Sequence, residues 1–288
     1  MKNILIRAAS GAVYVALIVL SILYGGNWAF PTLCGFFTFL GIMEFQRMAQ
    51  TDFFSSPQSL FVDLLIGLLI ITVTALGGLY NFGSFLQPIL MLFTLLLVIV
   101  RLIMQLYSHR ADAVKHLAYS LMSIFYVAVP LAFAIVLYHA FGAAMMLLVF
   151  IMIWLNDTGA FLVGSALGSH HLFKRLSPKK SWEGFVGGLC FCIAAGYLAK
   201  PIAPEYFELF SDGWLVGLGV LVCVMSTWGD LFESMIKRTF GVKDSGNILP
   251  GHGGILDRID SLLFVAPSVL LYLWCWSFFG SFTLVQGI

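Results

Sequence analysis

The stretch that decides the fold is Leu86–Leu106, LQPILMLFTLLLVIVRLIMQL, whose only charged side chain is Arg101. A helix needs about 20 consecutive, largely apolar residues to cross a hydrocarbon layer about 30 Å thick. Read along the whole chain, the same criterion finds eight further runs, at residues 8–25, 28–44, 60–80, 116–139, 142–166, 183–200, 213–232 and 260–280. The sequence therefore predicts an all-α, polytopic membrane protein with about nine transmembrane helices.

Composition supports a membrane protein and excludes several other classes. The 288 residues are 60% hydrophobic and 10% charged, with a mean hydropathy of +0.98, whereas a soluble domain carries about 25% charged residues. A net charge of +1 gives no sign of a nucleic-acid partner. The five cysteines all lie in apolar runs, where a thiol behaves as a small hydrophobic group, so neither a disulfide framework nor a zinc site is expected.

The distribution of basic residues predicts the orientation in the membrane. Cytoplasmic segments of membrane proteins are enriched in Lys and Arg. If the N-terminus is cytoplasmic, nine spans place 14 of the 15 basic residues on the inside and only Lys200 outside. We therefore expect an integral protein of the inner (cytoplasmic) membrane, with its C-terminus outside.

The two halves of the chain differ in chemistry. Residues 1–150 form mostly Leu, Ile, Phe and Val spans and are interpreted as a hydrophobic scaffold with possible oligomer contacts; their Asp63 lies near a predicted helix end, where it can reach the surface. From residue 151 onward, acidic residues enter the spans, namely Asp157, Glu183 and Asp230. Because an ionisable group in a membrane is costly unless it meets a partner, an ion or water, residues 151–288 are the predicted catalytic region.

The eighth span ends in a polar helix face. Asp230, Glu233, Ser234 and Lys237 follow the spacing i, i+3, i+4, i+7, which places them on one side of a helix. A salt-bridged helix end would explain this pattern equally well.

The next segment, GVKDSGNILPGHGG, is rich in glycine and leads into the ninth span. Glycine lets backbone N–H groups approach a phosphate closely, although glycine-rich turns are also common in plain loops. Lys243 and His252 could add phosphate contacts, and the ninth span then begins with Asp257, Arg258 and Asp260. Acidic residues in a first turn can also serve only to complement the helix dipole.

Taken together, these features indicate a site for a magnesium-bound polyphosphate. Mg²⁺ prefers carboxylate oxygens, while basic side chains and loop amides suit phosphate oxygens. A second segment, LSPKKSWEGFVGG, agrees, because Lys179 and Lys180 precede a helix N-terminus with Glu183 in its first turn. The spacing of Gly184 and Gly188 is more typical of close helix packing than of ligand binding.

The stretch from Ser234 to Asp260 closely resembles the defining motif of the phosphatidate cytidylyltransferases, or CDP-diacylglycerol synthases. The matching positions run from Ser234 through Lys237-Arg238, Lys243-Asp244-Ser245-Gly246 and Leu249-Pro250-Gly251-His252-Gly253-Gly254 to Asp257-Arg258-Ile259-Asp260, without a departure. NDTGAFLVGSALG and LSPKKSWEG look like the family's upstream pattern, so the resemblance covers about residues 151–281.

The resemblance implies a Mg²⁺-dependent enzyme, often a homodimer, that converts CTP and phosphatidate to CDP-diacylglycerol and pyrophosphate. It implies that Asp230 and Asp257 hold the metal. The predicted catalytic residues are Asp230, Asp257, Lys237, Arg238 and Asp260. The predicted substrate-binding residues are Ser234, Lys243, Asp244, His252, Gly253, Gly254, Arg258, Asp157, Lys179, Lys180 and Glu183.

Two other readings remain open from the residues alone. A CTP-dependent polyprenol kinase would also bind a nucleotide at the membrane but would release CDP. An ion or anion transporter would use Asp157 and Asp230 as a polar path, although the charged residues gather toward one face instead of lining the midplane. Pyrophosphate release separates the transferase from both.

Overall fold

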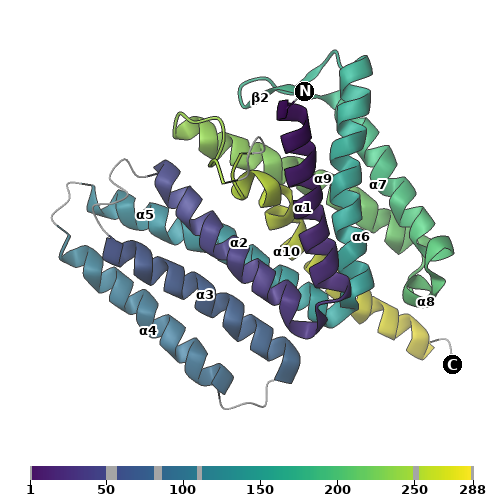
Figure 1. The fold of residues 1–288 in the computed structure, drawn as a ribbon. Helices are drawn as coiled ribbons and strands as arrows, with labels where there is room; N and C mark the ends of the chain where they lie inside the picture. Colours follow the sequence, from purple (N-terminus) through teal and green to yellow (C-terminus); the bar gives the residue numbers. More distant parts are fainter. Residues whose placement is uncertain (1, 50–56, 81–85, 109–111, 249–252, 287–288) are drawn as a thin grey trace. The chain divides into compact units, whose positions relative to one another are not determined.

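The computed structural model describes residues 2–49, 57–80, 86–108, 112–248 and 253–286, and nearly all of them are helical (Figure 1). The predicted all-α, polytopic fold is confirmed, with one small β-hairpin added. The elements are α1 (Lys2–Leu23), α2 (Gly26–Ala49), α3 (Pro57–Tyr80), α4 (Leu86–Leu106), α5 (Ala113–Ser123), the π-helical turn η2 (Ile124–Ala128), α6 (Val129–Leu167), β1 (His171–Phe173), β2 (Ser177–Ser181), α7 (Trp182–Ile202), α8 (Pro204–Phe207), α9 (Asp212–Thr239) and α10 (Leu256–Gln286).

Within the described part of the chain, seven helices are long and apolar enough to cross a membrane. One of them, Ala113–Leu167, has 55 residues and would be about 80 Å long if straight. It contains both predicted spans 116–139 and 142–166, and its backbone leaves the helical conformation at Gly142 (φ 83°, ψ 172°). The apolar part described for the first helix, Ser10–Leu23, is shorter than a span, so the count of nine spans stays a prediction.

The chain divides into two compact units, and the division does not coincide with the boundary predicted at residue 150. The first unit contains residues 1–140 and 236–259, and the second contains residues 141–235 and 260–288. Residues 236–259 thus belong to the first unit although the chain on either side of them belongs to the second. This segment begins inside α9 and ends inside α10. Part of the predicted catalytic region therefore folds with the first half of the chain.

In the first unit, α2 packs against α3, and α3 packs against α4 (Figure 1). The outer side of α4 is apolar, since Met91, Leu92 and Leu95 are each more than half exposed. Apolar side chains that face outward in this way suit contact with lipid chains.

A buried polar network joins four helices of this unit. Asp63 on α3 accepts hydrogen bonds from Arg101 Nε at 2.9 Å, from Gln46 Nε2 at 2.8 Å and from Ser120 Oγ. The Asp63 and Arg101 side chains are only 1% and 2% exposed. The expectation that Asp63 reaches the surface near a helix end is therefore wrong, because its charge is neutralised by Arg101 in the interior.

We predict that Arg101→Met lowers the free energy of unfolding by about 3–5 kcal/mol, because it leaves the Asp63 carboxylate buried without its counter-charge. The double variant Arg101→Met/Asp63→Asn should be more stable than Arg101→Met, since it removes both charges. Unfolding in detergent micelles measures both effects, with the exposed Lys115→Met as control. Equal or additive losses in the double variant would contradict a charge-based role.

Candidate functional site

Most of the predicted site residues fall into two groups, one in each compact unit; Ser234, Lys179, Lys180 and Glu183 lie outside both. The Asp257 loop, residues 237–258, belongs to the first unit. The acidic cluster, which we define as Asp157, Asp230, Glu233 and Asp260, belongs to the second unit. Each group is described separately below.

Asp257 organises the loop that bears its name. Its Oδ2 accepts hydrogen bonds from Ser245 N, Ser245 Oγ and Gly254 N, each at 2.9 Å. Its Oδ1 accepts a hydrogen bond from Lys237 Nζ at 2.6 Å, and the two side chains of this ion pair are 9% and 11% exposed. Asp257 therefore does more than complement the dipole of α10, because it fixes the loop that precedes the helix.

At two positions of the loop, steric constraints explain why the residue is glycine. Gly253 has a φ of +83°, which other residues rarely adopt, and a Cβ there would lie 2.6 Å from Asp257 Oδ2. At Gly254 a Cβ would lie 2.1 Å from Ser245 Oγ and 2.4 Å from the carboxylate of Glu44. The space beside both residues is thus occupied by the protein's own side chains.

Four predicted basic or acidic residues of the loop lie on its outside. Arg238, Lys243, Asp244 and Arg258 are all exposed. Arg238 Nη1 donates a hydrogen bond to the carbonyl of Val242 at 3.1 Å. These positions leave three cationic side chains accessible to a charged ligand. His252 lies outside the described residues.

The acidic cluster brings together carboxylates from three helices of the second unit. Asp260 on α10 lies within electrostatic range of Asp230 and Glu233 on α9 and of Asp157 on α6. Asp230 Oδ2 is 2.6 Å from Lys180 Nζ, and its Oδ1 accepts a hydrogen bond from Ser234 Oγ at 3.3 Å. Glu233 is 1% exposed. So many carboxylates in a partly buried place repel one another unless cations lie among them.

The donor set of this cluster suits a hard divalent cation. Among the residues that the structure describes, no three His, Cys, Asp or Glu side chains are arranged to hold an ion by themselves. Mg²⁺ rarely needs such a cage, because it is usually bound through one or two carboxylates together with waters and substrate phosphates. The cluster therefore fits Mg²⁺ that arrives with a polyphosphate. The predicted metal pair stays a prediction, since Asp230 and Asp257 belong to different units.

α7 packs closely on α6, the helix that carries Asp157. A Cβ at Gly184 would lie 2.8 Å from the carbonyl of Ala160, and one at Gly188 would lie 2.4 Å from Asn156 Oδ1. The two glycines therefore allow the helices to approach closely, which confirms the packing role predicted for them.

The β-hairpin carries the second predicted basic segment. Lys180, on β2, reaches Asp230, whereas Lys179 is exposed. Glu183 accepts hydrogen bonds from the backbone N–H groups of Ser169 and His170, and its Oε1 lies 2.6 Å from His170 Nδ1. Its carboxylate thus ties the segment before the hairpin to the first turn of α7, and substrate binding by Glu183 stays a prediction.

Sequence reasoning did not assign two acidic residues, Glu233 of the acidic cluster and Glu44, which contacts the Asp257 loop. Glu233 was noticed on the polar face of the eighth span but not assigned to the site. Glu44 was overlooked, although it ends the predicted span 28–44 and an acidic residue within a span is a functional candidate. Glu44 lies too far from the loop in sequence for a local pattern to predict their contact.

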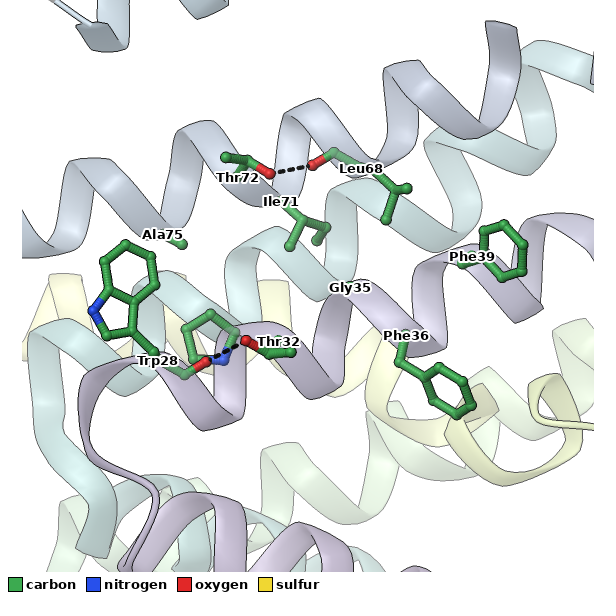
Figure 2. A pocket seen from close by; sticks show the side chains of 10 residues that line it. Trp28, Thr32, Gly35, Phe36, Phe39, Leu68, Ile71, Thr72 and Ala75 are labelled. Carbon is green, nitrogen blue, oxygen red and sulfur yellow. Dashed lines mark hydrogen bonds between the residues drawn. The ribbon is translucent and has the colours of Figure 1, made fainter. Parts of the chain in front are cut away.

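A hollow of about 420 Å³ between α2 and α3 has a different chemistry (Figure 2). Figure 2 shows Trp28, Phe36 and Phe39 from α2 and Leu68, Ile71 and Ala75 from α3 around it. Its two hydroxyl groups, on Thr32 and Thr72, donate to carbonyls of their own helices. Because none of the described residues that line it is ionisable, this hollow does not suit a nucleotide.

Comparison with known proteins identifies similar sequences over nearly the whole chain. The profile of the cytidylyltransferase family matches residues 6–276. Phosphatidate cytidylyltransferase from Staphylococcus aureus strain COL is 35% identical over 258 residues, which is 89% of this chain and 94% of that protein. The protein of that name from Staphylococcus saprophyticus is 33% identical over 263 residues, with the same coverage. That from Thermotoga maritima is 41% identical over 148 residues, 51% of this chain and 55% of that protein.

We predict that Gly188→Ala destabilises the protein, although Ala normally stabilises a helix by about 0.5–1 kcal/mol relative to Gly. The reason is the clash of its Cβ with Asn156. Gly213→Ala is the matched control in the same unit, because its Cβ would have no neighbour closer than Ser211 Oγ at 3.9 Å. Thermal unfolding in detergent should show a lower midpoint for Gly188→Ala alone; similar midpoints would argue against tight packing of α7 on α6.

Proposed function

The chain belongs to the cytidylyltransferase family, and from this premise we propose that it transfers CMP from CTP to phosphatidate, giving CDP-diacylglycerol and pyrophosphate. It is a membrane-embedded nucleotidyltransferase that uses CTP and a lipid. The identity of the lipid as phosphatidate is supported by the names of the relatives that match most of this chain. The observation that carries the proposal is the presence of two ionic groups, the Asp257 loop and the acidic cluster, in a chain that is only 10% charged.

The proposed reaction needs no nucleophilic side chain from the protein. A phosphate oxygen of phosphatidate attacks the α-phosphorus of CTP, and a new P–O bond forms as the bond from that phosphorus to the β-phosphate bridging oxygen breaks. The electron pair of the broken bond leaves with pyrophosphate. The protein's contribution is then to position two anions and to neutralise their charge.

Basic side chains are assigned to the phosphates. We assign Arg238, Lys243 and Arg258 to phosphate oxygens because all three are exposed on the Asp257 loop. Arginine suits this role, since its guanidinium group can donate two parallel hydrogen bonds to a phosphate. Lys237 is assigned to holding Asp257 in place, as their 2.6 Å ion pair indicates.

The acidic cluster is assigned to Mg²⁺, with Asp230 and Asp260 as the carboxylates that would hold it. The metal-binding role that the resemblance implies for Asp257 stays a prediction. Bound there, the ion would neutralise charge on the triphosphate and on the departing pyrophosphate. Lys180 is assigned to Asp230, whose carboxylate it orients and partly neutralises.

We place the reaction at the cytoplasmic face of the bacterial inner membrane. The support is the distribution of basic residues, which puts Lys179, Lys180 and Lys243 on the cytoplasmic side of the predicted topology. CTP is a cytoplasmic, membrane-impermeant anion, so a nucleotide site on that face has direct access to it. Homodimer formation stays a prediction.

We predict that the purified protein, given CTP labelled in its cytosine ring, phosphatidate and Mg²⁺, forms a chloroform-soluble cytidine product and one pyrophosphate per product. A chelator should abolish the reaction, and excess Mg²⁺ should restore it. Release of CDP with a phosphorylated lipid would indicate a lipid kinase instead. Absence of both products with phosphatidate and with other lipid phosphates would refute the proposal.

We predict different effects for two neighbouring lysines. Lys180→Ala should reduce kcat at least about tenfold, roughly 1.4 kcal/mol, because Asp230 loses the ammonium group that orients it. Lys179→Ala should mainly raise a substrate KM, because an exposed ammonium group adds attraction without fixing a carboxylate. Initial rates at varied CTP and varied lipid measure both constants, and identical effects of the two variants would argue against a specific role for the Lys180–Asp230 pair.

A further inference from the structure

Glu44, on α2, is a buried acidic residue that none of the proposed chemical steps uses. It is 4% exposed and lies in a helix that spans the membrane by length and composition. A carboxylate in such a place is costly unless its oxygens accept strong hydrogen bonds. Its partners therefore explain why an acidic residue occurs there.

Among the described residues, three hydrogen-bond donors contact Glu44, and all of them belong to the Asp257 loop. Glu44 Oε1 accepts a hydrogen bond from Ile255 N at 2.9 Å, and Oε2 accepts hydrogen bonds from Leu256 N at 2.9 Å and from Ser245 Oγ at 3.1 Å. The two amides open α10, where backbone N–H groups have no partner within the helix. Glu44 thus caps the start of α10 from another helix, more than 200 residues away in sequence.

The loop sequence is adapted to this carboxylate. A Cβ at Gly246 would lie 2.5 Å from Glu44 Oε1, and its three nearest atoms all belong to Glu44. A Cβ at Gly254 would lie 2.4 Å from Glu44 Oε2. Both glycines are therefore needed for Glu44 to enter the loop, whether or not a phosphate also approaches them.

Ser245 links Glu44 directly to Asp257. Its hydroxyl group lies 3.1 Å from Glu44 Oε2 and 2.9 Å from Asp257 Oδ2, while its backbone N–H also donates to Asp257. A shift of Glu44 would therefore move both the loop and the first turn of α10, which carries Asp257 and Arg258.

Neighbouring residues of the first two helices hold the same region. Tyr14 Oη on α1 donates to the carbonyl of Arg258 at 2.8 Å. Phe45, next to Glu44, packs edge to face against Phe240 at a centroid distance of 6.2 Å. Tyr14 and Phe45, from the first half of the chain, thus contact residues near both ends of the Asp257 loop.

We propose that Glu44 is a positioning residue for CMP transfer, which sets the geometry of Asp257 and Arg258 through Ser245 and the first turn of α10. This proposal rests on the proposed function. The two carboxylate oxygens of Glu44 accept from two backbone N–H groups, one each, whereas a glutamine amide would turn its NH₂ group toward one of these N–H donors.

The first test compares Glu44→Gln with Gln46→Met. Gln46 is the matched control because it lies on the same helix, is 2% exposed and makes two side-chain hydrogen bonds, but to Asp63 and Ser123 instead of the loop. Glu44→Gln should lower kcat about ten- to a hundredfold with little change in KM, the effect of misplacing groups at the reacting centre. Gln46→Met should retain the wild-type kcat even if its unfolding midpoint falls as far as that of Glu44→Gln.

Amide hydrogen exchange provides a readout that does not depend on activity. In Glu44→Gln, the amides of Ile255 and Leu256 should exchange faster than in the wild type, and Gln46→Met should leave them protected. If Glu44→Gln does not fold, Glu44→Asp gives the same comparison, because it keeps the charge but shortens the side chain by one methylene group. Unchanged protection of these two amides, or an equal loss of kcat in Gln46→Met, would overturn the proposal.

A second test uses the space that Glu44 occupies. Gly246→Ala alone should lower the unfolding midpoint and kcat, whereas adding it to Glu44→Ala should cause no further loss, because the clashing atoms are gone. Independent, additive losses would overturn the assignment of Gly246 to Glu44. If the wild-type protein transfers no CMP, the proposed function fails, while exchange and unfolding still decide whether Glu44 anchors the loop.

Discussion

The structure depends on one electrostatic constraint: a charged side chain among apolar helices must be neutralised or hydrogen-bonded where it lies. Asp63 meets Arg101, Asp257 meets Lys237, and Asp230 meets Lys180, each at 2.9 Å or less. Glu44 meets two helix-terminal amides and a hydroxyl group. Breaking the buried Asp63–Arg101 pair leaves a charge uncompensated, which costs about 3–5 kcal/mol, a large share of a typical folding free energy. The Asp230–Lys180 pair contributes less, because its side chains are 34% and 27% exposed. These contacts therefore fix which helices can neighbour one another.

The same constraint explains the glycines better than flexibility does. Gly246 and Gly254 leave room for Glu44, and Gly253 leaves room for Asp257. Gly188 leaves room for Asn156 where α7 meets α6. In each case a side chain or a neighbouring helix fills the space that a Cβ would need. In the loop, Gly246, Gly253 and Gly254 thus make room for two carboxylates.

The Asp257 loop and the acidic cluster offer different chemical environments to a ligand. In the Asp257 loop, Asp257 already accepts several hydrogen bonds, and the exposed side chains include three cations, which suits phosphate groups. In the second unit, Asp260 lies among three further carboxylates, which suits a metal ion.

The sequence by itself determined the membrane-embedded helical fold, because twenty-residue apolar runs have few alternatives in a bilayer. It also determined the family, since the spacing from Ser234 to Asp260 is a local pattern, and the packing role of Gly184 and Gly188. Only the tertiary structure decided the partners of the buried charges. Glu44 and Ser245 lie 201 residues apart, and Asp63 and Arg101 lie 38 apart. Such pairings arise from how helices pack, and no local periodicity encodes which distant donor will reach a given carboxylate.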